Sequence, residues 1–201
     1  TLSNRSSGKM GFAIAERAAL HGAKVTLIAG PVALPTPPGV TRIDVRSAVA
    51  MRSALWLALH PDLSGADALI MAAAVADYRP AETHASKIKR GNGPLVLELV
   101  PNPDLLAEIG EARRGLFPVL VGFALETDTD ERVVERAREK LAKKRVDMVV
   151  ANRAEESLGL DYVRATLVSA KDAESLPALP KEDAADKILD FIANRFQEPL
   201  R

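Results

Sequence analysis

The chain has 201 residues, with 27 Lys and Arg against 27 Asp and Glu, 47% hydrophobic residues, 4% aromatic residues and no cysteine. This length is enough for one domain with a full hydrophobic core. The zero net charge argues against a nucleic-acid or membrane-surface binder, and the missing cysteine excludes disulfides, thiolate zinc ligands and a thiol nucleophile. Since no apolar run approaches the ~20 residues of a membrane span and no signal peptide is visible, we expect a cytoplasmic protein without nucleic-acid or membrane partners.

The first half of the chain alternates helical and strand patterns. Apolar residues recur at helical spacing over 10–20, and a helix capped by Ser47 is expected to run to about Leu59. Short apolar runs predict buried strands at 24–29, 42–45 and 68–72.

The second half begins with a polar segment at about 80–94 that contains Gly91 and Gly93 and predicts a mobile flap. Beyond it, strands are expected at 95–99, 119–124, 147–151 and 164–169, and helices at 103–114, 130–145 and 183–196. The last of these strands is expected to be antiparallel to its neighbours.

This alternation predicts an α/β fold, a Rossmann-like and mainly parallel sheet with helices on both faces and a C-terminal antiparallel extension. Residues 1–201 are expected to form a single domain. Since the chain starts at Thr1 without Met, an N-terminal segment is expected to be missing. Ligands of such sheets bind at the carboxyl ends of the strands.

The segment from Asn4 to Gly11 leads into the first helix and contains Ser6, Ser7 and Gly8. Unpaired N–H groups at a helix start suit a phosphate or carboxylate. A Ser-capped helix with a tightly packed glycine explains the same pattern equally well. The segment is not a Walker A loop, because Met10 stands where Ser or Thr should hold magnesium.

A run of small residues ends at Asp77, directly after the strand expected at 68–72. Small side chains let a ligand approach the backbone, and an acidic residue at a strand end often accepts from ribose hydroxyls. Tight helix–strand packing with Asp77 as a cap is the simpler alternative.

Two groups of cations are candidates for binding phosphates. The flap holds Lys87, Lys89 and Arg90, and Lys140 and Lys144 are expected on one helix face. Solvated surface and ion pairs with neighbouring glutamates are the alternatives.

Two further candidates lie near predicted strand ends. Pro101-Asn102-Pro103-Asp104 predicts a rigid turn from strand to helix, and Phe123 ends a strand where an aromatic ring could stack on a base. Core packing is the default role for Phe123.

These segments, taken together with 30–38 and 122–127, occur in the order seen in bacterial phosphopantothenoylcysteine synthetase, which the chain resembles from Asn4 to about Asn152. That enzyme is the ligase half of the bifunctional coenzyme A biosynthesis flavoprotein. The resemblance implies a ligase that joins 4'-phosphopantothenate to L-cysteine. CTP, with Mg²⁺, would first activate the carboxylate as an acyl-cytidylate, and the cysteine amine would then displace CMP.

The resemblance also implies roles for individual residues. Asn4 and Lys87 would be catalytic, with Asn4 also holding the substrate beside Ala73 and Ala74. The implied nucleotide-binding residues are Asp77, Lys87, Asn102, Pro103, Asp104, Leu105, Phe123, Lys140 and Lys144. It leaves the metal ligands unknown and implies a homodimer that is fused to, or associated with, a flavin-dependent decarboxylase domain.

The chain departs from the family pattern in places. The glycine-rich strand that normally precedes Asn4 is absent, Arg90 replaces a usual lysine, and 153–161 matches poorly. Since the decarboxylase half is not present, FMN is not implied for this chain.

Two other readings stay open. A nicotinamide-dependent Rossmann reductase of the short-chain type needs Tyr-x-x-x-Lys, but Tyr78 is followed four residues later by Glu82, and Tyr162 by Thr166. A catalytically silent regulatory or assembly module is the other reading. The presence of Asn4, Asp77 and Lys87 argues against it.

Overall fold

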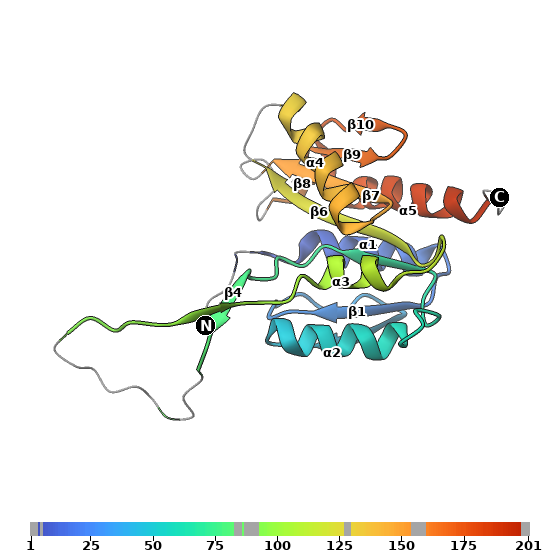
Figure 1. The fold of residues 1–201 in the computed structure, drawn as a ribbon. Helices are drawn as coiled ribbons and strands as arrows, with labels where there is room; N and C mark the ends of the chain where they lie inside the picture. Colours follow the sequence, from blue (N-terminus) through green and yellow to red (C-terminus); the bar gives the residue numbers. More distant parts are fainter. Residues whose placement is uncertain are drawn as a thin grey trace.

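The computed structural model describes Asn4 and residues 6–82, 86, 93–126, 130–153 and 160–197. Its helices are α1 (Lys9–Leu20), α2 (Ala48–Leu59), α3 (Leu105–Ala112), α4 (Asp130–Lys144) and α5 (Lys181–Gln197). Its strands are β1 (Val25–Ala29), β2 (Val40–Asp44), β3 (Ala68–Met71), β4 (Tyr78–Pro80), β5 (Leu99–Pro101), β6 (Val119–Glu126), β7 (Met148–Arg153), β8 (Tyr162–Val163), β9 (Ala165–Ser169), β10 (Ala173–Ser175) and β11 (Leu179–Pro180) (Figure 1).

The central sheet has five strands in the order β10-β9-β7-β6-β3. Strands β3, β6 and β7 are parallel, with Met71 opposite Gly122 and Gly122 opposite Val149. Strand β9 is antiparallel to both of its neighbours, β7 and β10. Strands β1 and β2 form a separate parallel pair, and no ladder within the described residues joins it to the larger sheet. The prediction of a mainly parallel sheet with an antiparallel extension is confirmed, although the parallel strands fall into two groups.

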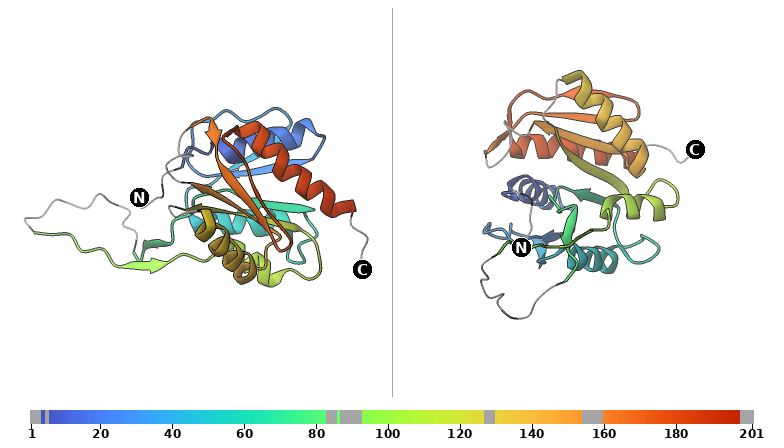
Figure 2. Two further views of the ribbon diagram at one scale, coloured as in Figure 1. Left: turned by 90° about the horizontal axis from the view of Figure 1, so that it is seen from above. Right: turned by 60° about the vertical axis from the view of Figure 1, so that its left-hand side comes forward.

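Alternating residues of the central strands feed two hydrophobic cores. Leu120 and Val149 face a core shared with α2, α3 and α4, whereas Val121 and Val150 face a core shared with α1 and α5. All four of these side chains are buried, as the near-continuous apolar sequence of a doubly covered strand requires. The views in Figure 2 show α1 and α5 side by side, with α4 on the other side of the sheet. Helices therefore cover both faces, as predicted.

Two helices start at residues that cap them. The Ser47 hydroxyl accepts a hydrogen bond from Ala50 N at 3.1 Å, and the Asp104 carboxylate accepts one from Ala107 N at 3.2 Å. Each cap satisfies a backbone N–H that lacks a partner in the first helical turn. Helix α2 therefore begins where the sequence predicts, whereas α3 begins two residues after the predicted Pro103, because Asp104 is the cap.

Strand β5 differs from the sequence prediction. The strand expected at 95–99 is wrong, since residues 94–98 have no regular structure and β5 begins at Leu99. Its partner is β4, which the sequence did not predict, and Pro80 lies opposite Leu99. Alternating apolar residues at 95–99 imitate a half-buried strand, but Leu95, Val96 and Leu97 are 65%, 86% and 51% exposed.

The N-terminal ends of β6 and β7 are held by one half-buried carboxylate. Asp147 accepts hydrogen bonds from Leu120 N at 2.8 Å, from Arg195 at 3.4 Å and from Arg113. Because Arg113 ends α3 and Arg195 lies on α5, this group ties the helices of the two faces together.

None of the described helices combines the length and the hydropathy that a membrane-crossing helix needs.

Candidate functional site

The segment after β3 forms the centre of the candidate site. Ala73 and Ala74 are exposed, so a ligand can reach the backbone there. The side-chain amide of Asn4 donates to Val75 O at 3.1 Å, which places Asn4 beside this segment. The structure therefore brings together the three residues that the resemblance assigns to the substrate.

The turn that leads into α3 is hydrogen bonded to the same segment. Asn102 N donates to Asp77 O at 2.7 Å, and the Asn102 side-chain amide donates to Ala76 O, also at 2.7 Å. Arg79 donates to Pro101 O at 2.6 Å and to the side-chain oxygen of Asn102 at 3.2 Å. Asp77 and Asn102 thus belong to one connected unit at the base of the β4–β5 ribbon, which projects from the body in Figure 1.

Asp104 connects the start of α3 with the last turn of α4. The Lys144 ammonium lies 3.0 and 2.9 Å from the two carboxylate oxygens of Asp104. Burial opposes ionisation of this carboxylate, but the hydrogen bonds from Lys144 and Ala107 N outweigh it, so the pKa of Asp104 lies below its usual range. Lys144 is therefore held in place by an internal anion.

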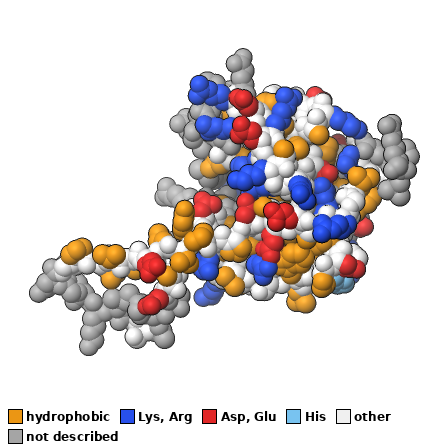
Figure 3. Space-filling view, in the orientation of Figure 1, with side chains coloured by type: hydrophobic (Ala, Val, Ile, Leu, Met, Phe, Trp, Pro, Cys, Tyr) orange, Lys and Arg blue, Asp and Glu red, His pale blue; other side chains and the backbone are white. Residues whose placement is uncertain are grey.

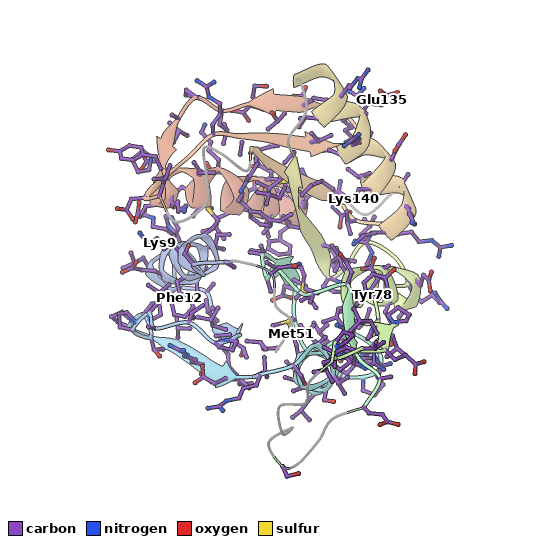
Figure 4. All side chains as sticks on the ribbon, turned by 90° about the vertical axis from the view of Figure 1, so that its left-hand side faces the viewer. Lys9, Phe12, Met51, Tyr78, Glu135 and Lys140 are labelled. Carbon is purple, nitrogen blue, oxygen red and sulfur yellow. The ribbon has the colours of Figure 1, made fainter. Side chains whose placement is uncertain are left out.

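The other residues that the resemblance assigns to the nucleotide on α3 and α4 differ in how far they are buried. Lys140 lies one turn before Lys144 on α4, as the predicted four-residue spacing requires, and is half-buried. Pro103 is half-buried, whereas the Leu105 side chain is 4% exposed and packs in the core. Leu105 can thus offer a ligand its backbone only. Figure 4 shows Lys140 and Tyr78 on one side of the view, with Lys9 and Phe12 on the other.

Phe123 and Asn152 lie on one face of the sheet near the carboxyl ends of β6 and β7. Phe123 is opposite Val150, and Asn152 follows Val150 by two residues, so both side chains point to the same face. Phe123 is half-buried and packs against the core shared with α1 and α5. The side-chain oxygen of Asn152 is buried and has no hydrogen-bond partner within the described residues.

A buried acceptor without a donor is costly, so the Asn152 oxygen marks a place where a ligand or water would be favoured. The sequence prediction missed this residue. The signal available was a single polar residue ending the apolar run 148–151, at the rim where ligands of such sheets bind.

The start of α1 shows the tightly packed glycine of one of the two readings that the sequence left open. The Ser6 and Ser7 hydroxyls accept from Gly8 N at 3.3 Å and from Lys9 N at 3.4 Å, but the N-cap of α1 is Gly8, which makes no side-chain cap hydrogen bond. Gly8 adopts φ of 73°, and a Cβ there would lie 2.9 Å from Val32, so glycine is required by the close packing of the 31–38 loop. The packing role of Gly8 is clear, and anion binding stays a prediction.

Lys87, Lys89 and Arg90 lie outside the described residues, together with most of the predicted flap. Within the described part of the chain, no group of three or more His, Asp or Glu side chains is arranged to hold a metal ion.

The segment between the flap and β5 exposes apolar side chains. Leu95, Val96, Leu97 and Leu99 are 65%, 86%, 51% and 44% exposed, and Tyr78 on the paired strand is 56% exposed. Figure 3 shows hydrophobic side chains along this projecting part, which we call the apolar arm (Tyr78 and residues 95–99). A group of exposed apolar side chains of this kind, here interrupted only by Glu98 within 95–99, is typical of an interaction site.

Comparisons with known proteins show which family the chain is similar to. The bifunctional protein CoaBC of coenzyme A biosynthesis from Vibrio cholerae is 41% identical over 196 residues, covering 95% of this chain and 47% of that protein. The chain therefore spans about half the length of the curated relatives it matches. The crystal structure of the C-terminal domain of a bifunctional protein CoaBC is 35% identical with a TM-score of 0.80, covering 98% of this chain and 87% of that chain.

A Cab2 H337A variant, whose structure contains phosphopantothenate-cysteine, has a TM-score of 0.71, covering 96% of this chain and 80% of that chain. At 16% identity it shows a shared fold alone. The family described as "DNA/pantothenate metabolism flavoprotein C-terminal domain" matches residues 1–196. The resemblance seen in the sequence is thereby confirmed, and the chain belongs to the family of this C-terminal domain.

Proposed function

We propose that the chain is the ligase domain that joins 4'-phosphopantothenate to L-cysteine in coenzyme A biosynthesis, with CTP as the activating nucleotide. The observation that carries the proposal is the hydrogen-bonded unit at the strand ends. Through it, Asn4 and Ala73 lie beside Val75 and Asp77, and the turn at Asn102 leads directly to the Asp104–Lys144 pair. The relatives in coenzyme A biosynthesis supply the substrate class.

The first step would form a mixed anhydride. A carboxylate oxygen of phosphopantothenate attacks the α-phosphorus of CTP, and the bond from that phosphorus to the pyrophosphate oxygen breaks. Negative charge builds up on phosphoryl oxygens, so nearby ammonium groups lower the barrier. Lys140 and Lys144 would act from α4, and Lys87 is assigned to the triphosphate by the resemblance.

In the second step the cysteine amine attacks the acyl carbon, CMP leaves with the anhydride oxygen, and the amine loses a proton. Asn4 would serve this step, since its amide donates to Val75 O and so lies beside the exposed Ala73 and Ala74. Its two-sided amide can donate to the acyl oxygen while it holds the substrate.

Mg²⁺ would enter with CTP and be held chiefly by phosphate oxygens, because the candidate nucleotide site contains few carboxylates. Asp104 is already paired with Lys144, so the exposed carboxylate of Asp77 is the residue that would bind the ion. When bound, the ion neutralises charge on the triphosphate.

We propose in addition that the apolar arm is covered in a homodimer. The exposed run 95–99 with Tyr78 offers the kind of surface that a second copy can bury. As the matched relatives are about twice as long and bifunctional, we also propose that this domain works fused to, or associated with, a flavin-dependent decarboxylase domain.

The test is pyrophosphate release from purified protein with phosphopantothenate, Mg²⁺ and either CTP or ATP. We expect release with CTP in the absence of cysteine, and CMP formation after cysteine is added. Thermal stabilisation by NADPH without pyrophosphate release would contradict the ligase and support the reductase reading.

The matched variants are Lys144→Ala and Lys143→Ala, two lysines on the same helix. Lys144 pairs with Asp104, whereas Lys143 is exposed. Lys144→Ala should raise the KM for CTP roughly tenfold, the cost of one charge-assisted hydrogen bond, and Lys143→Ala should leave it nearly unchanged. Equal KM values in the two variants would remove Lys144 from the nucleotide site.

A further inference from the structure

Two segments of the candidate site come from different parts of the chain and must be held in register. Ala76 and Asp77 follow β3, while Asn102 and Asp104 lie between β5 and α3. The whole predicted flap separates them in sequence. Their relative position therefore depends on contacts made at the base of the β4–β5 ribbon.

Arg79 makes an unusual set of contacts there. It is exposed, yet within the described part of the chain its guanidinium donates to Pro101 O and to the Asn102 side-chain oxygen, and not to a carboxylate. Arginine is a donor only, so it selects the oxygen end of the Asn102 amide. Both acceptors lie at the end of β5 or directly after it, beside the strand that carries Arg79.

This selection fixes the other end of the amide. With its oxygen toward Arg79, the Asn102 side chain must present its NH₂ to Ala76 O, which it meets at 2.7 Å. The backbone N–H of Asn102 is bound to Asp77 O at 2.7 Å. Arg79 thus closes a ring of hydrogen bonds that sets the direction of two carbonyl groups next to Asp77.

We propose that Arg79 is a positioning residue of the nucleotide site, which it serves by orienting the Asn102 amide and so holding the Asp77 and Asp104 segments in register. The inference rests on the proposed function, since it names the residue that aligns that same site. In this arrangement most hydrogen-bonding groups of the Asn102 side chain already have partners within the protein. Asn102 then shapes the site and leaves its backbone carbonyl and one amide hydrogen for a ligand.

The test compares Arg79→Ala with Arg114→Ala. Arg114 is a matched control because it is exposed and donates to Glu111 O at 2.9 Å, outside the candidate site. We expect Arg79→Ala to raise the KM for CTP about fivefold to tenfold with a smaller change in kcat, the cost of a lost charged hydrogen bond. Arg114→Ala should match the wild type, and Arg79→Lys should recover part of the loss through Pro101 O.

Amide hydrogen exchange supplies a readout that needs no activity. Arg79→Ala should speed exchange of the Asn102 N–H, while amides of β6 and β7 keep their protection. Unchanged exchange and unchanged KM in Arg79→Ala would overturn the inference, as would an equal effect in Arg114→Ala. If the wild type itself does not turn over CTP, the proposed function fails, and exchange at Asn102 still decides whether Arg79 holds the two segments.

Discussion

The carboxylate of Asp104 makes two structural interactions. It caps α3 through Ala107 N and also holds Lys144 of α4. Asparagine caps helices about as well as aspartate, so Asp104→Asn should keep the cap and lose the ion pair with Lys144. Asp104→Ala removes both interactions. Loss of activity in Asp104→Ala would therefore not show whether the helix cap or the ion pair with Lys144 matters for the site.

A second aspartate links α1 to α5 and gives a pH dependence of stability. Asp186 receives two hydrogen bonds from Arg17, at 2.8 and 2.6 Å, and lies 3.1 Å from His21. The hydrogen bond from Arg17 is the largest cause that holds the pKa of Asp186 below its usual range. A lowered carboxyl pKa stabilises the fold above the unfolded value of about 4, and this gain is lost as the pH falls through the folded value.

Asp186→Asn should therefore lower the free energy of unfolding by about 1 kcal/mol at pH 7. The difference from the wild type should shrink as the pH is lowered below about 4. Urea unfolding of both proteins at a series of pH values measures it. A difference that stays constant down to pH 3 would show that the Arg17 contact is not its source.

The sequence pattern predicts some residues of the candidate site and misses others for identifiable reasons. Asn102 and Asp104 are predicted because each directly follows a proline, Pro101 or Pro103, at the end of a strand, which is a local signal. Arg79 and Asn152 were missed because their roles depend on partners far along the chain or on an acceptor left without one. Such relations exist only after folding.

At the scale of elements, α3 and α4 touch backbone to backbone. A Cβ added at Gly110 would lie 1.9 Å from Lys144 O, so no side chain fits between the two helices there. The backbones therefore set the spacing between Asp104 and Lys144. Gly11 in α1 is different, because an added Cβ would meet Ala72 at an ordinary 3.7 Å.

Gly110→Ala should destabilise the protein by about 3 kcal/mol, since the clash exceeds the ~1 kcal/mol that alanine gains in a helix. Gly11→Ala should be neutral or slightly stabilising, because alanine has a higher helix propensity than glycine and meets no clash there. Denaturant midpoints of the two variants make the comparison. A Gly110→Ala protein as stable as Gly11→Ala would mean that the helices separate at little cost.

Strands β8, β10 and β11 were not predicted either, but two of the errors, the strand expected at 95–99 and the unpredicted β4, share one cause. The run 95–99 alternates like a strand, but its first residues have no strand partner within the described residues, and pairing begins at Leu99 with β4. Strand β4 contains Arg79 and Pro80, which carry no strand pattern of their own. Pairing across the chain, and not local propensity, determines this ribbon.

At the scale of the whole molecule, the apolar arm is the surface that a second copy would cover. Val96→Asp places a charge at its most exposed position, where the side chain is 86% exposed. Burying that charge without a partner should weaken dimerisation at least about 100-fold. Leu57→Asp is the control, since Leu57 on α2 is 78% exposed and lies outside the arm.

Sedimentation velocity over a range of protein concentrations measures this effect. The wild type and Leu57→Asp should sediment as dimers at concentrations where Val96→Asp is monomeric. A monomeric wild type would refute the dimer, and a dimeric Val96→Asp would place the interface elsewhere.

The pairing of Lys144 with Asp104 also determines how the candidate site responds to ionic strength. Dissolved salt screens the attraction between a lysine and a polyanion, so affinity normally falls as salt rises. Here a phosphate that approaches Lys144 also approaches a carboxylate 2.9 Å from the ammonium. Salt screens that repulsion as well, and the two effects oppose each other. If the nucleotide binds at Lys144 as proposed, the pair would lower its affinity in dilute buffer and would make that binding less sensitive to the salt concentration.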